Sequence, residues 1–217
     1  MRVNDLDALI NDLSTGIETI QAANNGISAL TKLVESAQAL VSHAQKNADG
    51  TMRGTLAHRF DALLSQIDQI AVSSGFNGIN LLAGNDLTIA ITADGTSSIA
   101  VSAFNDTAAG DLAIDSATNK WAASTDISAA SAQLTLALMT LWSQTQALSS
   151  SLSTMQIRLN FAKAMINALS NAVDNLPLSE SNEEGTNLLA LQTRQQKSTT
   201  ALSLAMQVDQ NVLRLFR

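Results

Sequence analysis

Residues 134–176 read LTLALMTLWSQTQALSSSLSTMQIRLNFAKAMINALSNAVDNL, and this stretch decides the fold. A 4-3 spacing runs through it, and only Thr145 breaks the apolar series. The apolar positions are Leu134, Leu138, Leu141, Leu148, Leu152, Met155, Leu159, Ala162, Ile166, Leu169, Val173 and Leu176. This heptad pattern indicates a helix that packs along its whole length. At 1.5 Å per residue such a helix is about 65 Å long, which suits a rod better than a globule.

The N-terminal third of the chain has the same kind of pattern. Its apolar positions are Leu6, Ile10, Leu13, Ile17, Ile20, Ile27, Leu30, Val34, Ala37, Val41 and Ala44. The series slips by three residues between Asn24 and Leu30, which is typical of a locally overwound seam. We expect residues 47–50 to end this helix, with Gly50 as a left-handed cap. A second helix then carries Leu56, Phe60, Leu63, Leu64, Ile67 and Ile70.

The middle of the chain changes period. Leu87 to Ile91 and Ile99 to Ala103 alternate apolar and small or polar residues around Asp94-Gly95, which predicts a β-hairpin. We place this hairpin at the far tip of a helical rod. Residues 105–125 are small and polar. We expect them to form a surface loop, with at most one short strand, whose removal leaves the helices nearly intact.

The C-terminal part is expected to hold two helices. Asp126 suits the N-cap of the long helix, and Pro177 is expected to end it. A short acidic linker at 179–185 would lead to a last helix over about 186–215.

These elements predict a mainly α fold: a long antiparallel helical rod, coiled-coil-like, with a small β-hairpin tip. Helices from both ends of the chain pair because neither apolar stripe can be buried alone. We divide the chain into N-terminal rod helices (3–84), a variable tip (85–125), the long rod helix (126–178), and a linker with a C-terminal helix (179–217).

Composition excludes several classes of protein. The 217 residues include no Cys and few aromatics, which disfavours a β-sandwich and excludes disulfides and thiolate zinc sites. The net charge is −7 and no basic cluster occurs, so we expect no nucleic-acid partner. No apolar run is long enough to predict membrane insertion, and no secretory signal sequence is visible.

Catalytic or metal chemistry has little support in the sequence. His43 and His58 lack a zinc-protease spacing and fall on different expected helices, so we interpret them as solvated histidines. The acidic residues between 86 and 115 do not fit a calcium loop. We therefore expect no enzyme, no metal and no cofactor.

Four segments resemble a known family. They are Asp68-Gln-Ile-Ala71 followed by Phe76-Asn-Gly-Ile-Asn-Leu-Leu82, then Met155-Gln-Ile-Arg-Leu-Asn-Phe161, and Asn211-Val-Leu-Arg-Leu-Phe216 near the end. Their order and spacing resemble bacterial flagellin, most closely the alphaproteobacterial type. The resemblance implies a structural, self-assembling subunit of the extracellular flagellar filament, exported by the flagellar type III pathway. Its partners would be other flagellin subunits and, before assembly, an export chaperone. The alternatives are a hook–filament junction protein, or a non-flagellar helical stalk or binding module.

The sequence departs from the family pattern in two places. Flagellins begin with a segment of the inner coiled coil that carries the export signal, and we expect this sequence to start after it. Either Met1 is a start placed inside a longer mature sequence or the chain is a naturally short homologue. Many flagellins also carry an Arg-Val-Arg-Glu-Leu-Ala motif for a vertebrate immune receptor. Here Glu35, Ala37, Gln38 and Ala39 depart from it, and since arginine forks are hard to replace, we expect no receptor activation.

Two sets of residues are predicted to bury apolar surface. The rod seam is interpreted as intramolecular core: Leu134, Leu138, Leu141, Leu148, Leu152, Met155, Leu159, Ile166 and Leu169. The last helix lacks an obvious mate in this chain. We therefore expect its stripe to be an assembly or chaperone interface: Leu202, Ala205, Val208, Val212, Leu215 and Phe216.

Overall fold

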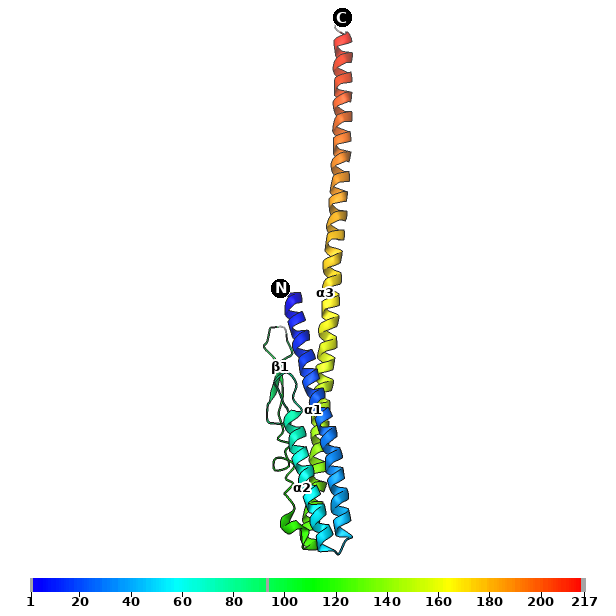
Figure 1. The fold of residues 1–217 in the computed structure, drawn as a ribbon. Helices are drawn as coiled ribbons and strands as arrows, with labels where there is room; N and C mark the ends of the chain where they lie inside the picture. Colours follow the sequence, from blue (N-terminus) through cyan, green and yellow to red (C-terminus); the bar gives the residue numbers. More distant parts are fainter. Residues whose placement is uncertain (1, 93, 216–217) are drawn as a thin grey trace. The chain divides into compact units, whose positions relative to one another are not determined.

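The computed structural model describes residues 2–92 and 94–215, which divide into two compact units, 1–164 and 165–217. The elements are α1 (Arg2–Gln45), α2 (Gly50–Ser73), β1 (Leu87–Ala90), β2 (Ser98–Val101), the 3₁₀ helix η1 (Thr118–Trp121) and α3 (Ser124–Leu215) (Figure 1). Side chains are described for 4–92, 94–173 and 182–207. The mainly α fold with one small antiparallel sheet confirms the predicted fold class.

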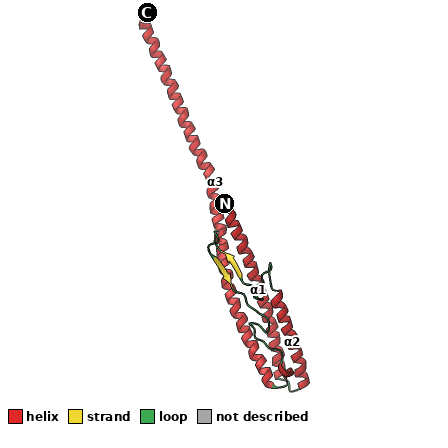
Figure 2. Ribbon diagram, turned by 90° about the vertical axis from the view of Figure 1, so that its left-hand side faces the viewer, coloured by secondary structure: helices red, strands yellow, loops and turns green. Residues whose placement is uncertain are grey.

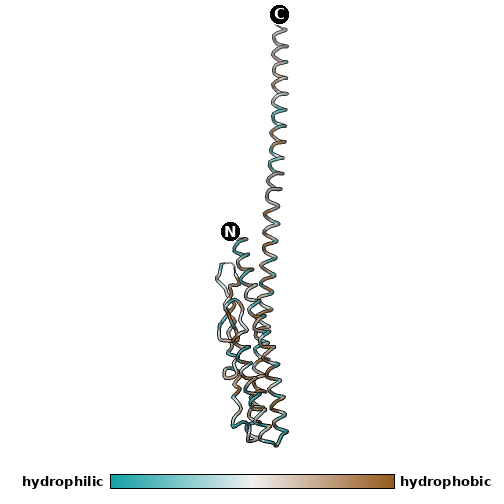
Figure 3. The backbone as a smooth tube through the Cα atoms, viewed as in Figure 1, coloured by the Kyte–Doolittle hydropathy of each residue, from teal (hydrophilic) through white to brown (hydrophobic). Residues whose placement is uncertain are grey.

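The first unit is a bundle of α1, α2 and the part of α3 up to residue 164, with the helices lying side by side (Figures 1 and 2). The helices are amphipathic, and hydrophobic and hydrophilic segments alternate along their traces (Figure 3). The buried positions include Leu13, Ile20, Leu30 and Val34 of α1, Phe60, Leu64 and Ile67 of α2, and Ile127, Leu134, Leu141, Leu148 and Met155 of α3. Burying each large apolar side chain contributes roughly 1.5–3 kcal/mol.

The buried rows differ from the predicted ones in register. On α3 the centre of the row passes through Ala137 and Gln144, while Leu138 is only half-buried. On α1, Ala23 is buried, so the two successive three-residue steps fall at 17–20–23 instead of between Asn24 and Leu30. A small alanine can take the central position because it lets neighbouring helices approach closely, whereas a leucine beside it packs at the edge.

Gly50 was expected to cap the first helix, and this expectation is wrong. α1 ends at Gln45, and Gly50 is the first residue of α2. The carboxylate of Asp49 accepts a hydrogen bond from the backbone N–H of Thr51 at 2.9 Å, which makes Asp49 the N-cap of α2. A capping carboxylate satisfies an N–H group that the first helical turn otherwise leaves unpaired.

The hairpin is confirmed, with Ile89 opposite Ile99 and Gly95 in the left-handed region of the turn. Its expected place at the far tip is wrong. β1 packs on α1, and a Cβ added at Gly16 would lie 2.9 Å from Cγ1 of Ile89 and 3.2 Å from the sulfur of Met155. The hairpin therefore lies beside the N-terminal half of α1 (Figure 1).

Residues 105–125 are not the dispensable surface loop that we expected. Ala108, Leu112, Ile114 and Trp121 are buried, and the Trp121 ring packs on Phe60 with centroids 5.0 Å apart. Beyond the hairpin, the described residues contain only isolated β-bridges and no further strand. The segment completes the core of the first unit.

Two carboxylates on α2 hold that segment in place. Asp61 accepts a hydrogen bond from the N–H of Ala117 at 2.8 Å, and Asp68 accepts one from the N–H of Ala108 at 2.7 Å. Because the two aspartates are seven residues apart, both project from the same face of the helix. The seven-residue spacing in the sequence indicates the shared face, but it does not indicate which backbone N–H groups the two aspartates bind.

α3 does not end at Pro177, and residues 179–185 form no linker; both expectations are wrong because α3 continues to Leu215. A proline removes one backbone N–H from the helical ladder, so it weakens a helix without always terminating it. Glu183 and Glu184 are good helix formers, which outweighs the acidic character that suggested a linker.

Candidate assembly surfaces

The described His, Asp and Glu side chains do not gather into a metal site. His43 and His58 are exposed on α1 and α2, and no described group of three or more His, Cys, Asp or Glu could hold a metal ion. None of the described helices combines the length and apolarity that crossing a bilayer requires. The features that call for a functional explanation are therefore surfaces that a partner could bury.

The predicted rod seam lies partly inside the first unit. Leu134, Leu141, Leu148 and Met155 are fully buried. The half-buried seam residues Leu138, Leu152 and Leu159 pack against the same core. Ile166 and Leu169 belong to the second unit, where they are half-exposed.

The predicted C-terminal interface lies in the second unit. Leu202 is 61% exposed and Ala205 is exposed, as is every described side chain from 182 to 207. The side chains of Val208, Val212 and Leu215 fall outside the described ones, and Phe216 falls outside the described residues. The exposed large apolar residues of this stretch are Leu188, Leu189, Leu191, Leu202, Leu204 and Met206.

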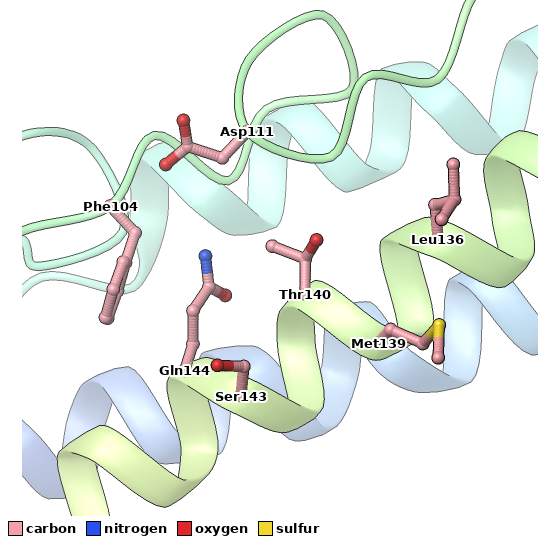
Figure 4. Close-up of a pocket in the computed structure, with 7 residues that line it drawn as sticks. All are labelled: Phe104, Asp111, Leu136, Met139, Thr140, Ser143 and Gln144. Atoms are coloured by element: carbon pink, nitrogen blue, oxygen red, sulfur yellow. The ribbon is translucent and has the colours of Figure 1, made fainter.

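Sequence reasoning missed a groove on the first unit. It has a volume of about 480 Å³. One side of it is α3, and the other is the segment that follows β2 (Figure 4). Its lining residues are Phe104, Asp111, Leu136, Met139, Thr140, Ser143 and Gln144. Leu136 and Met139 are apolar but fall outside the predicted heptad, which is the signal that could have indicated a second apolar face.

A buried carboxyl group lies next to this groove. Asp106 is fully buried, and the side-chain amide of Gln144 donates a hydrogen bond to its Oδ1 at 2.7 Å. Burial raises the pKa of Asp106 to about 6, the nearby Asp111 charge adds to the rise, and the Gln144 hydrogen bond opposes it. The second oxygen of Asp106 and Oε1 of Gln144 are both buried acceptors without a partner. A proton on the carboxyl group would supply one donor where two acceptors lack one.

The stretch that departs from the immune-receptor motif lies on α1. Glu35 and Ala39 are exposed, Gln38 is half-buried, and Ala37 is fully buried in the core. Only part of the stretch is therefore presented to a partner.

Comparisons with known proteins agree with this architecture. Residues 1–86 match the model of the bacterial flagellin N-terminal helical region, and residues 137–216 match that of the bacterial flagellin C-terminal helical region. Flagellin FljM of Caulobacter vibrioides is 25% identical over 98% of this chain and 78% of its own length, and FljK of the same organism is 28% identical over the same shares. Flagellin A of Rhizobium meliloti is 42% identical over 31% of this chain and 18% of its own.

A solved structure shares the fold. The crystal structure of Bacillus cereus flagellin aligns with a TM-score of 0.59 at 17% identity, covering 70% of this chain and 86% of that one.

Proposed function

Because the chain belongs to the bacterial flagellin family and is a structural subunit of the flagellar filament, we propose that it joins the filament through the apolar stripe of its C-terminal helix. The family is structural and not enzymatic. Its members assemble with other flagellin subunits, and the filament is extracellular.

The exposure of the second unit supports this proposal. Leu188, Leu191, Leu202 and Met206 fall on one face of the helix at about 100° per residue, and all four are exposed. Ordering the backbone costs about 1–2 kcal/mol per residue, and burying a large apolar side chain returns roughly 1.5–3 kcal/mol. While the stripe is exposed to water, little burial free energy offsets the cost of ordering the backbone. Packing against partner helices would supply that free energy and stabilise this helix.

The same stripe is the natural place for an export chaperone. We propose that a chaperone covers it before assembly and that export follows the flagellar type III pathway. An exposed apolar helix face of this kind fits a hydrophobic groove on a partner, which is a recurrent mode of helix recognition.

Substitutions on the stripe test the assembly proposal. Leu202→Asp and Leu191→Asp place a charge where a partner would bury it, whereas Thr193→Asp adds the same charge on another face of the helix. Pelleting and electron microscopy should show filaments for the wild-type protein and Thr193→Asp, and soluble protein for both leucine variants. Filaments of normal yield from both leucine variants would refute the role of the stripe. The circular dichroism of the unassembled variants checks that the first unit still folds.

A further inference from the structure

α3 carries two apolar faces. Met139, Trp142, Ile157 and Phe161 are 62%, 68%, 65% and 58% exposed, although all four lie within the first unit. Met139 and Ile157 are five full turns apart and project in the same direction. The buried Leu148, nine residues from each, points about half a turn away. The exposed face is therefore opposite the face that packs into the core, and the protein's own fold cannot bury it.

This outer face is also free of charge. No Asp, Glu, Lys or Arg occurs between Asp126 and Arg158, which is the longest such run in the chain. The polar residues in the run are Ser, Thr and Gln. The chain as a whole carries a net charge of −7, so two copies repel one another over most orientations. The outer face of α3 is a long surface across which like copies approach without facing like charges.

We propose that this outer face of α3 is a contact surface for a second copy of the chain, separate from the C-terminal stripe. It consists of Leu136, Met139, Trp142, Ile157 and Phe161. The inference rests on the proposed function, because a filament subunit needs more than one contact surface. A nucleic acid or an anionic membrane would find no positive charge here, whereas a neutral protein surface would need none.

The groove gives this contact a specific feature. Leu136 and Met139 project from α3 on one side of it, and Phe104 lies on the other (Figure 4). Asp111, from the segment after β2, is the charged residue among those that line it, so a neutral or basic side chain of the neighbour fits there best. A volume of about 480 Å³ accommodates a large side chain of the neighbouring copy. Growth of a filament requires a heterologous contact, so the neighbour presents a different surface and no closed dimer is expected.

The two tryptophans provide a natural test. Trp121 is fully buried and Trp142 is 68% exposed, so acrylamide quenching of the free protein reports mainly on Trp142. We expect the quenching constant to fall at least fivefold when filaments form. If electron microscopy shows filaments whose tryptophan emission is quenched as in the free protein, this inference is overturned and the proposed function stands. If no filaments form, both fail.

A matched pair of variants provides the second test. Met139→Lys places a charge on the outer face, and Gln156→Lys places the same charge on the flank of the same helix, where residue 156 is exposed. The critical concentration for assembly should rise at least tenfold for Met139→Lys and stay within twofold for Gln156→Lys. Equal behaviour of the two variants, whether both assemble normally or both fail, would overturn the inference.

Discussion

Gly26 lies on α1 where the chain that follows α2 crosses it. A Cβ added there would clash with Oγ of Ser74 and would lie 2.6 Å from Cδ1 of Leu82 and 2.7 Å from Cβ of Ser74. Gly54, within α2, has nothing within 4 Å of the same added atom. The two glycines therefore have different effects on stability. Gly26 permits close packing, whereas Gly54 only lowers helix propensity.

Alanine substitutions at Gly26 and Gly54 distinguish these two effects. Gly26→Ala should lower the free energy of unfolding by about 1–3 kcal/mol because it overpacks a tight contact. Gly54→Ala should raise it by about 0.5–1 kcal/mol through helix propensity. Urea unfolding followed by circular dichroism measures both. Shifts in the same direction would mean that the approach at Gly26 is not tight.

Asp106 makes stability depend on pH. Its pKa in the folded protein is about 6, above the ordinary value of 3.8, because burial favours the neutral form. The folded state holds this proton more tightly than the unfolded state does. The resulting contribution to the free energy of unfolding is fully present below pH 3.8 and is lost as the pH rises through 6. From pH 5 to 7.5 the loss amounts to about 1.4 kcal/mol.

The variant Asp106→Asn isolates this contribution, because the amide has the shape of the acid and no charge at any pH. We expect urea unfolding of the wild-type protein to weaken from pH 5 to 7.5 relative to Asp106→Asn. The rest of the chain is identical in the two proteins, so its contributions cancel in the difference. Parallel pH profiles would show that Asp106 is not buried as the structure has it.

At the scale of elements, the carboxylates of α2 determine whether the segment after the hairpin is part of the core. Asp68 accepts the N–H of Ala108 in a part-buried site, whereas Asp86 accepts the N–H of Ala103 at the same distance, 2.7 Å, in an exposed one. When a buried N–H loses its acceptor, water cannot reach it to accept the hydrogen bond, whereas water can replace the acceptor of an exposed N–H.

Asp68→Ala should therefore lower the free energy of unfolding by about 1–3 kcal/mol, and Asp86→Ala by clearly less. Hydrogen exchange should accelerate at Ala108 in Asp68→Ala and stay slow at the centre of α1. If Asp68→Ala is as stable as Asp86→Ala, the hydrogen bond from Ala108 to Asp68 does not hold the segment in place.

The elements that depend on local period could be predicted from the sequence. α1, α2 and the hairpin follow from alternating or heptad spacing, which each segment carries in its own residues. The burial of Trp121 depends on Phe60, far away in the sequence, and no local pattern indicates that contact. The expected end of the long helix at Pro177 is wrong for another reason: a single proline does not terminate a helix that has good helix formers after it.

The candidate surfaces were predictable to a similar extent. The spacing of Leu202, Ala205 and Val208 indicated a stripe in need of a partner. The outer face of α3 is harder to predict, because Leu136, Met139 and Trp142 lie outside a heptad that is already complete. The heptad pattern accounts for one apolar face of α3 and says nothing about the second. Only the burial observed in the structure shows which of the two faces is covered.

At the scale of the whole molecule, the two units differ in what stabilises them. The first unit buries a continuous apolar core, whereas every described side chain from 182 to 207 in the second is exposed. A helix without tertiary packing opens locally far more often than one inside a bundle. Before assembly, the second unit should therefore be the labile part of the subunit.

Limited trypsin digestion tests this difference at matched sites. Lys32 and Arg59 are exposed on the packed helices of the first unit, and Arg194 and Lys197 are exposed in the second. Because all four side chains are accessible, the rate of cleavage reports how often the surrounding backbone opens. In the unassembled protein, mass spectrometry should show cleavage at Arg194 and Lys197 at least tenfold faster than at Lys32 and Arg59. In filaments the two later sites should become resistant, because neighbouring subunits cover that helix. Equal rates at all four sites in the free protein would mean that the C-terminal helix is stable without a partner, and ordering would then not be coupled to assembly.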